Sequence, residues 1–269
     1  MSVLDAVKRT VQRTLSRAGY QLVRHENPSQ RATQRGVLLR AKQLGLAPAT
    51  VIDVGVADGT PALYETFPDA RLLLLEPLVE YRDALERIVR AHPGASYELA
   101  AASASRGSVT LNVHPDLFGS SLYLEREDSD VNGVPRTVPT VTVDDACAAR
   151  GLKGPYLIKV DVQGAELDVL RGATRTLRET ALVLLEVSLL EFFEGGPVMA
   201  DVLAFMAEQE FCAYDLCDLS YRPLDGAMSQ LDVAFVRKTG ALRRHHTYAT
   251  PAQRRAHNEA ARVARPHAS

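Results

Sequence analysis

The chain lacks any long apolar run. No stretch of its 269 residues approaches the ~18 consecutive apolar residues that a membrane-spanning helix needs. The first residues include basic side chains, but they show neither the apolar core nor the small-residue cleavage site of a secretory signal. The sequence therefore predicts a cytoplasmic protein without a transmembrane segment.

Cysteine and net charge are also scarce. The three cysteines, Cys147, Cys212 and Cys217, have no metal-ligand spacing, and an odd number of them without a signal suits a reducing compartment. We expect three buried thiols and no metal site. The formal net charge of −2 supplies no basic field for nucleic acid, so nucleic acid is not an expected partner.

What the chain does contain is an alternation of short apolar runs with amphipathic segments. This order predicts an α/β fold with a doubly wound, mostly parallel sheet. Strands are predicted at 50–54, 70–75, 96–101, 156–162 and 181–187, with helices at 60–67, 81–92, 165–179 and 199–209. An additional strand is expected at 108–113, and an extended segment leads into a short helix within 138–148. Strands 211–216 and 231–237, joined by the turn-rich 218–229, predict a hairpin that adds an antiparallel strand at the sheet edge.

Three domains or segments are expected. Residues 1–48 form an N-terminal helical cap, with a basic amphipathic helix over 3–18 and a second helix over 34–44. The first helix lacks the bulky aromatic residues of membrane-surface helices, so docking on the parent domain is favoured, although the helix could also mediate a homodimer. Residues 49–239 form the main domain, and 240–269 an Arg/Ala/His-rich tail that is loosely helical or disordered from 251.

A glycine-bounded turn follows the first predicted strand. Gly55 and Gly59 bound this turn. Asp53 places one carboxylate on the preceding strand, and Asp58 places a second one within the turn. Glycine accepts positive φ angles and lets a ligand approach the backbone. A strand, a bare loop and a helix N-terminus together form a cradle for a nucleotide or cofactor.

Acidic residues end three of the apolar strands: Glu76, Asp161 and Glu186. In a parallel sheet all three lie at the carboxyl edge, where open α/β sheets bind ligands. A carboxylate after the second strand can accept hydrogen bonds from both ribose hydroxyls of an adenosine. We therefore expect Glu76 to contact a ribonucleoside-type cofactor.

The spacing of the glycines argues against NAD. A dinucleotide fingerprint that starts at Gly55 would need glycines where the chain has Ala57 and Thr60. A turn flanked by acids instead suits a cofactor with a cationic centre and a free amino group, as in S-adenosylmethionine. An NAD(P)-dependent oxidoreductase and a non-catalytic adenosine-binding module remain as alternative interpretations.

Several segments of the chain match the motifs of a known family. They are 51–55, 75–77, 119–122, 141–144 and 169–173, with Ile158-Lys159-Val160-Asp161-Val162-Gln163-Gly164-Ala165-Glu166 as the most specific one. In these segments the chain resembles the FkbM family of S-adenosylmethionine-dependent O-methyltransferases, and the resemblance covers residues 50–238. It implies a class I methyltransferase (Rossmann-like) fold, whose seven-stranded sheet has an antiparallel last strand, and S-adenosylmethionine as cofactor. Two departures are Val56-Ala57-Asp58, where the family usually has Ala-Asn and a small residue, and Gln163, where Glu is more common.

The resemblance further implies that the acceptor is a hydroxyl of a sugar or a secondary metabolite. A hydroxyl nucleophile benefits from a positioned base. We expect Asp161 or Glu186 to be that base, Glu166 to organise the loop before its helix, and His114 to be an alternative base. The expected cofactor contacts are Asp53, Gly55, Asp58, Gly59, Glu76, Pro77, Ala101 and Asp161. The expected substrate contacts are His114, Ser120 and Ser121, in or beside the long polar loop 115–134, and no obligatory metal is expected.

Overall fold

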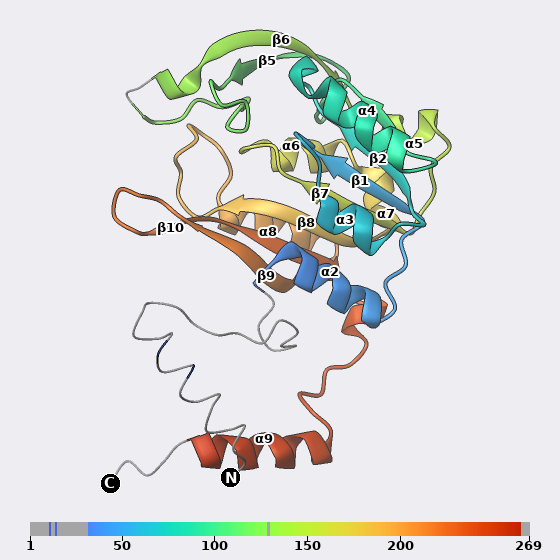
Figure 1. Cartoon of the computed structure of the whole chain (residues 1–269), viewed down its shortest axis with the longest axis vertical. Helices are drawn as coiled ribbons and strands as arrows, with labels where there is room; N and C mark the ends of the chain where they lie inside the picture. The colour runs from blue at the N-terminus through green and yellow to red at the C-terminus, as the bar shows by residue number, and fades with distance from the viewer. Residues whose placement is uncertain (1–10, 12–13, 15–31, 128–129, 265–269) are drawn as a thin grey trace.

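The fold consists of a central sheet covered by helices on both faces, with a small second sheet above one end (Figure 1). The computed structural model describes residues 11, 14, 32–127 and 130–264. The predicted basic helix over 3–18 therefore lies outside the described residues, apart from its residues 11 and 14. Among the described residues, every helix is too short or too polar to span a bilayer.

The central sheet has seven strands in the order β3-β2-β1-β7-β8-β10-β9. Its strands are β1 (Thr50–Val54), β2 (Arg71–Leu75), β3 (Ser96–Glu98), β7 (Tyr156–Val160), β8 (Thr180–Ser188), β9 (Phe211–Tyr221) and β10 (Met228–Arg237). The first five named here run parallel, while β10 is antiparallel to both of its neighbours, β8 and β9. The seven-stranded, mostly parallel sheet implied by the resemblance is confirmed.

Alternate residues of the strands pack into two different cores, which explains the continuous apolar runs. Leu72 and Leu74 of β2 belong to the core under α2 and α3, whereas Leu73 and Leu75 belong to the core on the other face. Successive side chains of a strand point to opposite faces, so a strand covered on both faces must be apolar throughout. The two-sided burial predicted from these runs is therefore correct.

The helices form the outer layers. One face carries α2 (Gln34–Gln43), α3 (Pro61–Thr66) and α4 (Arg82–Ala91), and the other carries α5 (Val143–Ala149), α6 (Glu166–Arg171), α7 (Thr174–Arg178) and α8 (Met199–Glu208) (Figure 1). Helix α2 confirms the helix predicted at 34–44, and it buries Val37, Leu38 and Ala41 against the domain. The tail contains α9 (Pro251–Ala264), so 251–264 follows the helical alternative.

The helix predicted over 165–179 is broken in two. Gly172 lies between α6 and α7, and a Cβ there would sit 2.1 Å from the carbonyl oxygen of Ser103. The Asp144 carboxylate accepts hydrogen bonds from the backbone amides of Arg175 and Thr176, which lie at the start of α7. The cap of α5 is Thr142, whose hydroxyl accepts from the amide of Asp145.

A second sheet, β4-β6-β5, was not predicted as such. Its strands are β4 (Ala101–Ala102), β5 (Gly107–Val113) and β6 (Val134–Val141). The strand predicted at 96–101 is thus two strands: β3 pairs with β2 in the central sheet, and β4 pairs with β6. The predicted extra strand at 108–113 is β5, which pairs with β6 in antiparallel fashion and carries the chain over the end of the central sheet (Figure 1).

The predicted hairpin exists but sits differently from the expectation. Its antiparallel strand β10 is inserted between β8 and β9, so β9 forms the edge of the sheet. Both strands are also longer than predicted, and the connection shrinks from the expected 218–229 to residues 222–227. Most of the additional residues of both strands, next to the connection, are half-buried or exposed, so they lack the continuous apolar pattern from which strands were predicted.

Candidate active site

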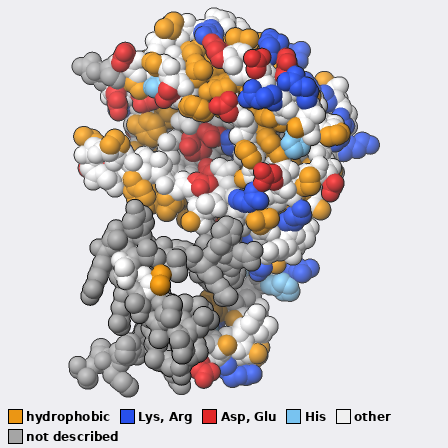
Figure 2. Space-filling model, viewed as in Figure 1, with side chains coloured by type: hydrophobic (Ala, Val, Ile, Leu, Met, Phe, Trp, Pro, Cys, Tyr) orange, Lys and Arg blue, Asp and Glu red, His pale blue; other side chains and the backbone are white. Residues whose placement is uncertain are grey.

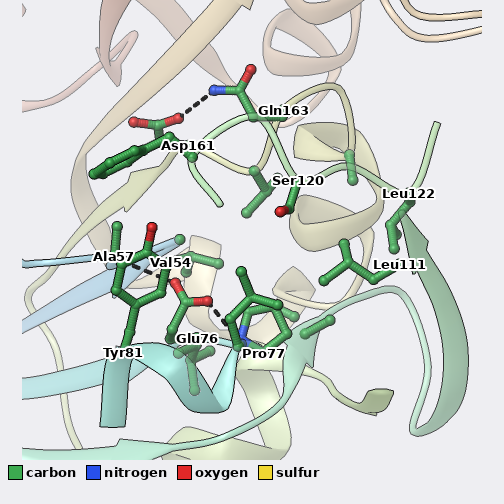
Figure 3. A pocket seen from close by; sticks show the side chains of 18 of the residues that line it. Val54, Ala57, Glu76, Pro77, Tyr81, Leu111, Ser120, Leu122, Asp161 and Gln163 are labelled. Carbon is green, nitrogen blue, oxygen red and sulfur yellow. Dashed lines mark hydrogen bonds between the residues drawn. The ribbon is translucent and has the colours of Figure 1, made fainter. Parts of the chain in front are cut away.

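A cavity of about 170 Å³ opens at the carboxyl ends of the central strands, and Leu111 of the second sheet forms part of its wall (Figure 3). In the space-filling view, acidic side chains gather in a hollow in the middle of one face, bordered by apolar side chains (Figure 2). Of the predicted site residues, those that line the cavity are Gly55, Glu76, Pro77, Ala101, Ser120, Asp161 and Glu186. The sheet edge therefore brings together the three strand-end acids that the sequence indicated.

The turn after β1 needs glycine at its first position. Gly55 has a φ of +75°, and a Cβ on it would lie 1.8 Å from the backbone oxygen of Asp161. The turn therefore packs directly on the end of β7. Gly59, with a φ of +112°, faces Ile88 of α4 instead, and neither Gly59 nor Asp58 lines the cavity.

Glu76 lies at the end of β2 and is almost fully buried. One carboxylate oxygen accepts a hydrogen bond from the amide of Ala57 at 3.0 Å, and the other from the amide of Leu78 at 2.9 Å (Figure 3). Burial raises the pKa of Glu76 despite these hydrogen bonds. The carboxylate thus joins the β1 turn to the segment after β2 and still borders the cavity.

Asp53 lies beneath the cavity rather than on its wall. Its side chain is fully buried on the α2–α3 face, where it accepts a hydrogen bond from the hydroxyl of Tyr64. The ammonium of Lys159, its neighbour on β7, lies 3.7 Å from Asp53 and 3.2 Å from Asp161. Burial opposes the charge of Lys159, but the two carboxylates raise its pKa to about 12. Lys159 is therefore a buried cation that compensates both acids.

Gln163 joins the two acids expected to act as base. Its side-chain amide donates to Asp161 at 3.1 Å and to Glu186 at 2.8 Å, and Gln230 donates to the same oxygen of Glu186 at 2.9 Å. Burial, together with the charges of Asp161 and Asp232, raises the pKa of Glu186 to about 9. Gln163 has a φ of +53°, an uncommon conformation that turns the chain after β7.

Buried acids that hold protons predict a stability that falls as pH rises. Burial raises the pKa values of Glu186 to about 9 and of Glu166 and Asp232 to about 7, above the ordinary 4.5 and 3.8. Between the ordinary and the raised pKa, the folded state keeps a proton that the unfolded chain releases. In that pH range, each group lowers the free energy of unfolding by up to ~1.4 kcal/mol per pH unit. Above its raised pKa, the group causes no further loss of stability.

Urea unfolding of Glu186→Gln between about pH 5 and about pH 8 checks this expectation. The variant should lose less stability over the interval than the wild type, because its amide does not titrate. Exposed Glu208 offers a control, since Glu208→Gln should leave the slope unchanged. Equal slopes for the wild type and Glu186→Gln would contradict the assignment of a retained proton.

The remaining predicted residues, Glu166, Ser121 and His114, do not line the cavity. Glu166 is buried at the start of α6 and accepts from the amide of Gly164 at 3.0 Å, so it contacts the loop it was expected to organise. Ser121 donates to the backbone oxygen of Gln163 and so ties the 115–134 loop to that turn. His114 pairs with Asp116 at 2.6 Å and does not line the cavity.

Several cavity residues were not predicted from the sequence. Tyr81, Phe118 and Gln163 supply polar or aromatic groups. The apolar wall is formed by Val54, Ala57, Leu75, Leu78, Ala102, Leu111, Leu117, Leu122, Val162 and Ala165. Tyr81 lay only five residues after Glu76, so its nearness to a strand-end acid was the available signal. Part of the apolar wall comes from the second sheet and the loop beside it (Ala102, Leu111, Leu117 and Leu122), and this part gave no signal in the sequence.

One group of side chains outside the cavity could hold a metal ion among the described residues. The ligand atoms of Cys217, Asp218 and Asp232 lie within 4.8 Å of one another. The two acids already accept hydrogen bonds from the backbone and side chain of Gln34. The three cysteines are free thiols, with Cys147 and Cys217 buried and Cys212 half-buried.

Comparison with known proteins matches residues 46–216 to the methyltransferase FkbM domain. The 2-O-methyltransferase NoeI of Sinorhizobium fredii (strain NBRC 101917 / NGR234) is 30% identical over 61% of this chain and 73% of its own length. The hexuronic acid methyltransferase AglP of Haloferax volcanii is 28% identical to this chain. The alignment covers 50% of this chain and 54% of AglP.

Among solved structures, magnesium protoporphyrin IX methyltransferase from Synechocystis PCC 6803 with bound SAM aligns with 86% of this chain and 81% of its own. Its identity is 9% and its TM-score 0.42, values too low to support an assignment. The family match covers well over half of the chain and replaces both alternatives, the NAD(P)-dependent oxidoreductase and the non-catalytic adenosine module. The chain belongs to the FkbM methyltransferase family and is an S-adenosylmethionine-dependent O-methyltransferase.

Proposed function

We propose that this protein methylates a hydroxyl group of a sugar or of a glycosylated natural product. The observation that carries the proposal is the pair Asp161 and Glu186, joined by Gln163 on the wall of the same cavity as Glu76. A polar, acid-lined wall suits a hydroxyl-rich acceptor, and one relative is named for action on a hexuronic acid.

The residues around the β1 turn fit an adenosyl cofactor. Gly55 brings bare backbone to the cavity, and Glu76 borders it with a carboxylate whose oxygens can accept further hydrogen bonds from ribose hydroxyls. The carboxylate of Asp161 provides negative charge opposite them. S-adenosylmethionine, when bound, supplies an electrophilic methyl group on a sulfonium. We assign Gly55, Glu76, Pro77, Ala101 and Asp161 to its binding.

Asp53 and Gly59 support that site from outside the cavity in this proposal, whereas Asp58 does not line the cavity. Asp53 holds Lys159 in place, and Gly59 allows the turn to pack closely on α4. Lys159 in turn lies beside Asp161 and the backbone oxygen of Gly55. The network fixes the positions of the turn and of Asp161 relative to each other.

Asp161 is the better candidate for the base of the two acids. Asp161 lines the cavity, and its carboxylate lies 3.2 Å from the Lys159 ammonium, so the two groups form an ion pair at the cavity wall. Glu186, with a pKa raised to about 9 by burial and by its acidic neighbours, holds a proton near neutral pH. Glu186 is then a neutral neighbour of Asp161 and adds no negative charge beside it.

Ser120 is the proposed contact for the acceptor from the long loop. Its hydroxyl accepts from the amide of His114 at 3.0 Å and its side chain borders the cavity. His114 and Ser121 act indirectly in this proposal, since His114 positions Ser120 and Ser121 fixes the loop on Gln163. Small-molecule or glycan hydroxyls would enter beside this loop.

Transfer of label from methyl-labelled S-adenosylmethionine to a panel of acceptors tests the proposal. The panel should contain free and glycosidic hexuronic acids, neutral sugars, and a catechol as a non-sugar hydroxyl. Label on a sugar hydroxyl, recovered as a base-stable ether, is the expected result. Labelling of the catechol alone, or of a carboxylate as a base-labile ester, would overturn it.

The role of Glu76 predicts a binding defect in Glu76→Gln. In the glutamine side chain, an NH2 group replaces one of the two carboxylate oxygens, and this group cannot accept a hydrogen bond. Hydrogen bonds to charged groups contribute ~1.5–3 kcal/mol each. We expect the Kd for S-adenosylhomocysteine, measured by calorimetry, to rise at least about tenfold. Glu80→Gln, in the same segment but paired with Arg136 outside the cavity, should leave the Kd unchanged. An unchanged Kd in Glu76→Gln would remove the ribose assignment.

Location and assembly complete the proposal. The free thiols suit a reducing compartment, and we place the protein in the cytoplasm. A homodimer, with the N-terminal segment as its contact, and independence from nucleic acid and from an obligatory metal also stay predictions. Sedimentation of the full chain and turnover in EDTA are the measurements that check them.

A further inference from the structure

The hydroxyl of Tyr81 is a buried polar group without a hydrogen-bond partner among the described residues. Tyr81 ends the short 3-10 helix η1 (Val79–Tyr81), which follows Glu76, and only 6% of the residue is exposed. Leaving such a hydroxyl unpaired is costly in a folded protein, so an orphan of this kind calls for an explanation. Its backbone has a role of its own in the segment, since its amide donates to the oxygen of Leu78.

The side chain of Tyr81 borders the cofactor cavity. In Figure 3 its ring stands beside Glu76 and rises toward the cavity from the segment below. Phe118, from the long loop, lies 6.0 Å from the ring between centroids and so helps to hold its orientation. Burial, and next the charge of Glu76, raise the pKa of Tyr81 to about 12, which keeps the phenol protonated as a donor.

The groups around Tyr81 indicate which kind of ligand could accept a hydrogen bond from its hydroxyl. Both oxygens of Glu76 already accept backbone amides, and the apolar side chains of Val54 and Leu111 make up other parts of the wall. A ligand with oxygen or nitrogen acceptors, placed by Glu76 and enclosed by apolar surface, would meet the phenol. The adenosyl group has these acceptors on a ribose and a purine.

We propose that Tyr81 is a cofactor-binding residue whose hydroxyl donates a hydrogen bond to the adenosyl part of S-adenosylmethionine. The inference rests on the cofactor site of the proposed function. Binding would then satisfy a buried hydroxyl that the protein itself leaves unpaired. The hydroxyl contributes to affinity for the cofactor and nothing to the stability of the free protein.

Calorimetry with S-adenosylhomocysteine and thermal unfolding of the free protein, applied to Tyr81→Phe, test the proposal. The ring and its packing remain, so the Tm should be unchanged or slightly higher. The Kd should rise about 5- to 10-fold, the effect of one neutral hydrogen bond. The shift of Tm on adding S-adenosylhomocysteine should shrink correspondingly.

Tyr156→Phe is a matched control with the opposite pattern. The Tyr156 hydroxyl donates to the backbone oxygen of Leu152 at 2.8 Å, in the core and away from the cavity. Its removal should lower the Tm and leave the Kd unchanged. An unchanged Kd in Tyr81→Phe, or a raised acceptor KM with unchanged Kd, would overturn the inference.

Glu76→Gln separates this inference from the proposed cofactor site. If Glu76→Gln weakens binding of S-adenosylhomocysteine while Tyr81→Phe does not, the role of Tyr81 is wrong and the cofactor site stands. If neither variant changes the Kd, the placement of the cofactor in this cavity fails, and the inference fails with it. A higher Kd in both supports the proposal.

Discussion

Asp161→Asn is expected to lose about 100- to 10,000-fold in kcat, the usual contribution of a general base. The amide cannot take a proton from the acceptor hydroxyl. It keeps nearly the same shape and can still contact the side chain of Gln163. Lys159 retains its pairing with Asp53, so the fold should persist. Turnover of an acceptor found in the labelling panel measures the effect.

Glu186→Gln is the matched comparison for this result. If Glu186 carries a proton near neutral pH, its amide replacement should change kcat by less than about tenfold. The Kd for S-adenosylhomocysteine, determined for both variants, separates loss of cofactor from loss of chemistry. A large defect in Glu186→Gln with a normal Asp161→Asn would move the base to Glu186, and two normal variants would exclude both acids.

Gly55→Ala is expected to have the largest effect on stability. The new Cβ would lie 1.8 Å from the backbone oxygen of Asp161, and alanine at a φ of +75° is strained as well. Neither the β1 turn nor the end of β7 can move without disturbing the paired strands. We expect a loss of at least ~4 kcal/mol in the free energy of unfolding, a size reserved for a few mechanisms such as backbone strain and overpacking.

Gly45→Ala separates the clash from the strain. Gly45 also has a positive φ, +100°, but a Cβ there meets no atom within 4 Å. It should cost only the ~1–2 kcal/mol of a left-handed residue. Urea unfolding of both variants gives the comparison. A Gly55→Ala protein as stable as Gly45→Ala would show that the close contact with Asp161 is absent.

The part of the site carried by strand ends was predictable from local patterns. Glu76, Asp161 and Glu186 each follow or end an apolar run, and parallel strands bring their carboxyl ends to one edge. The period of two residues also held the information that Asp53 points away from its neighbour Val54. Asp53 was nevertheless expected to contact the cofactor, because its partner Lys159 lies 106 positions later in the chain, a separation that local patterns do not reveal.

The second sheet escaped prediction for a physical reason. Strand β4 has only two residues, too few for a periodic signal, and β6 has an exposed first half and contains two prolines, Pro135 and Pro139. The pairing of β4 with β6 stabilises both, although their sequences are 30 or more positions apart. Ala102 of β4 and Leu111 of β5 reach the cavity wall from this second sheet, so their place in the cavity was not predicted.

The sequence by itself determined the central sheet, the family and the acids at the sheet edge, because burial on both faces and strand-end residues leave local signals. Only the tertiary structure decided the surroundings of each acid. Asp161 faces a buried lysine, Glu186 lies among other acids, and Gln163 joins the two. The charge state of a carboxyl group depends on burial and on neighbours brought from distant parts of the chain, and folding alone assembles those neighbours.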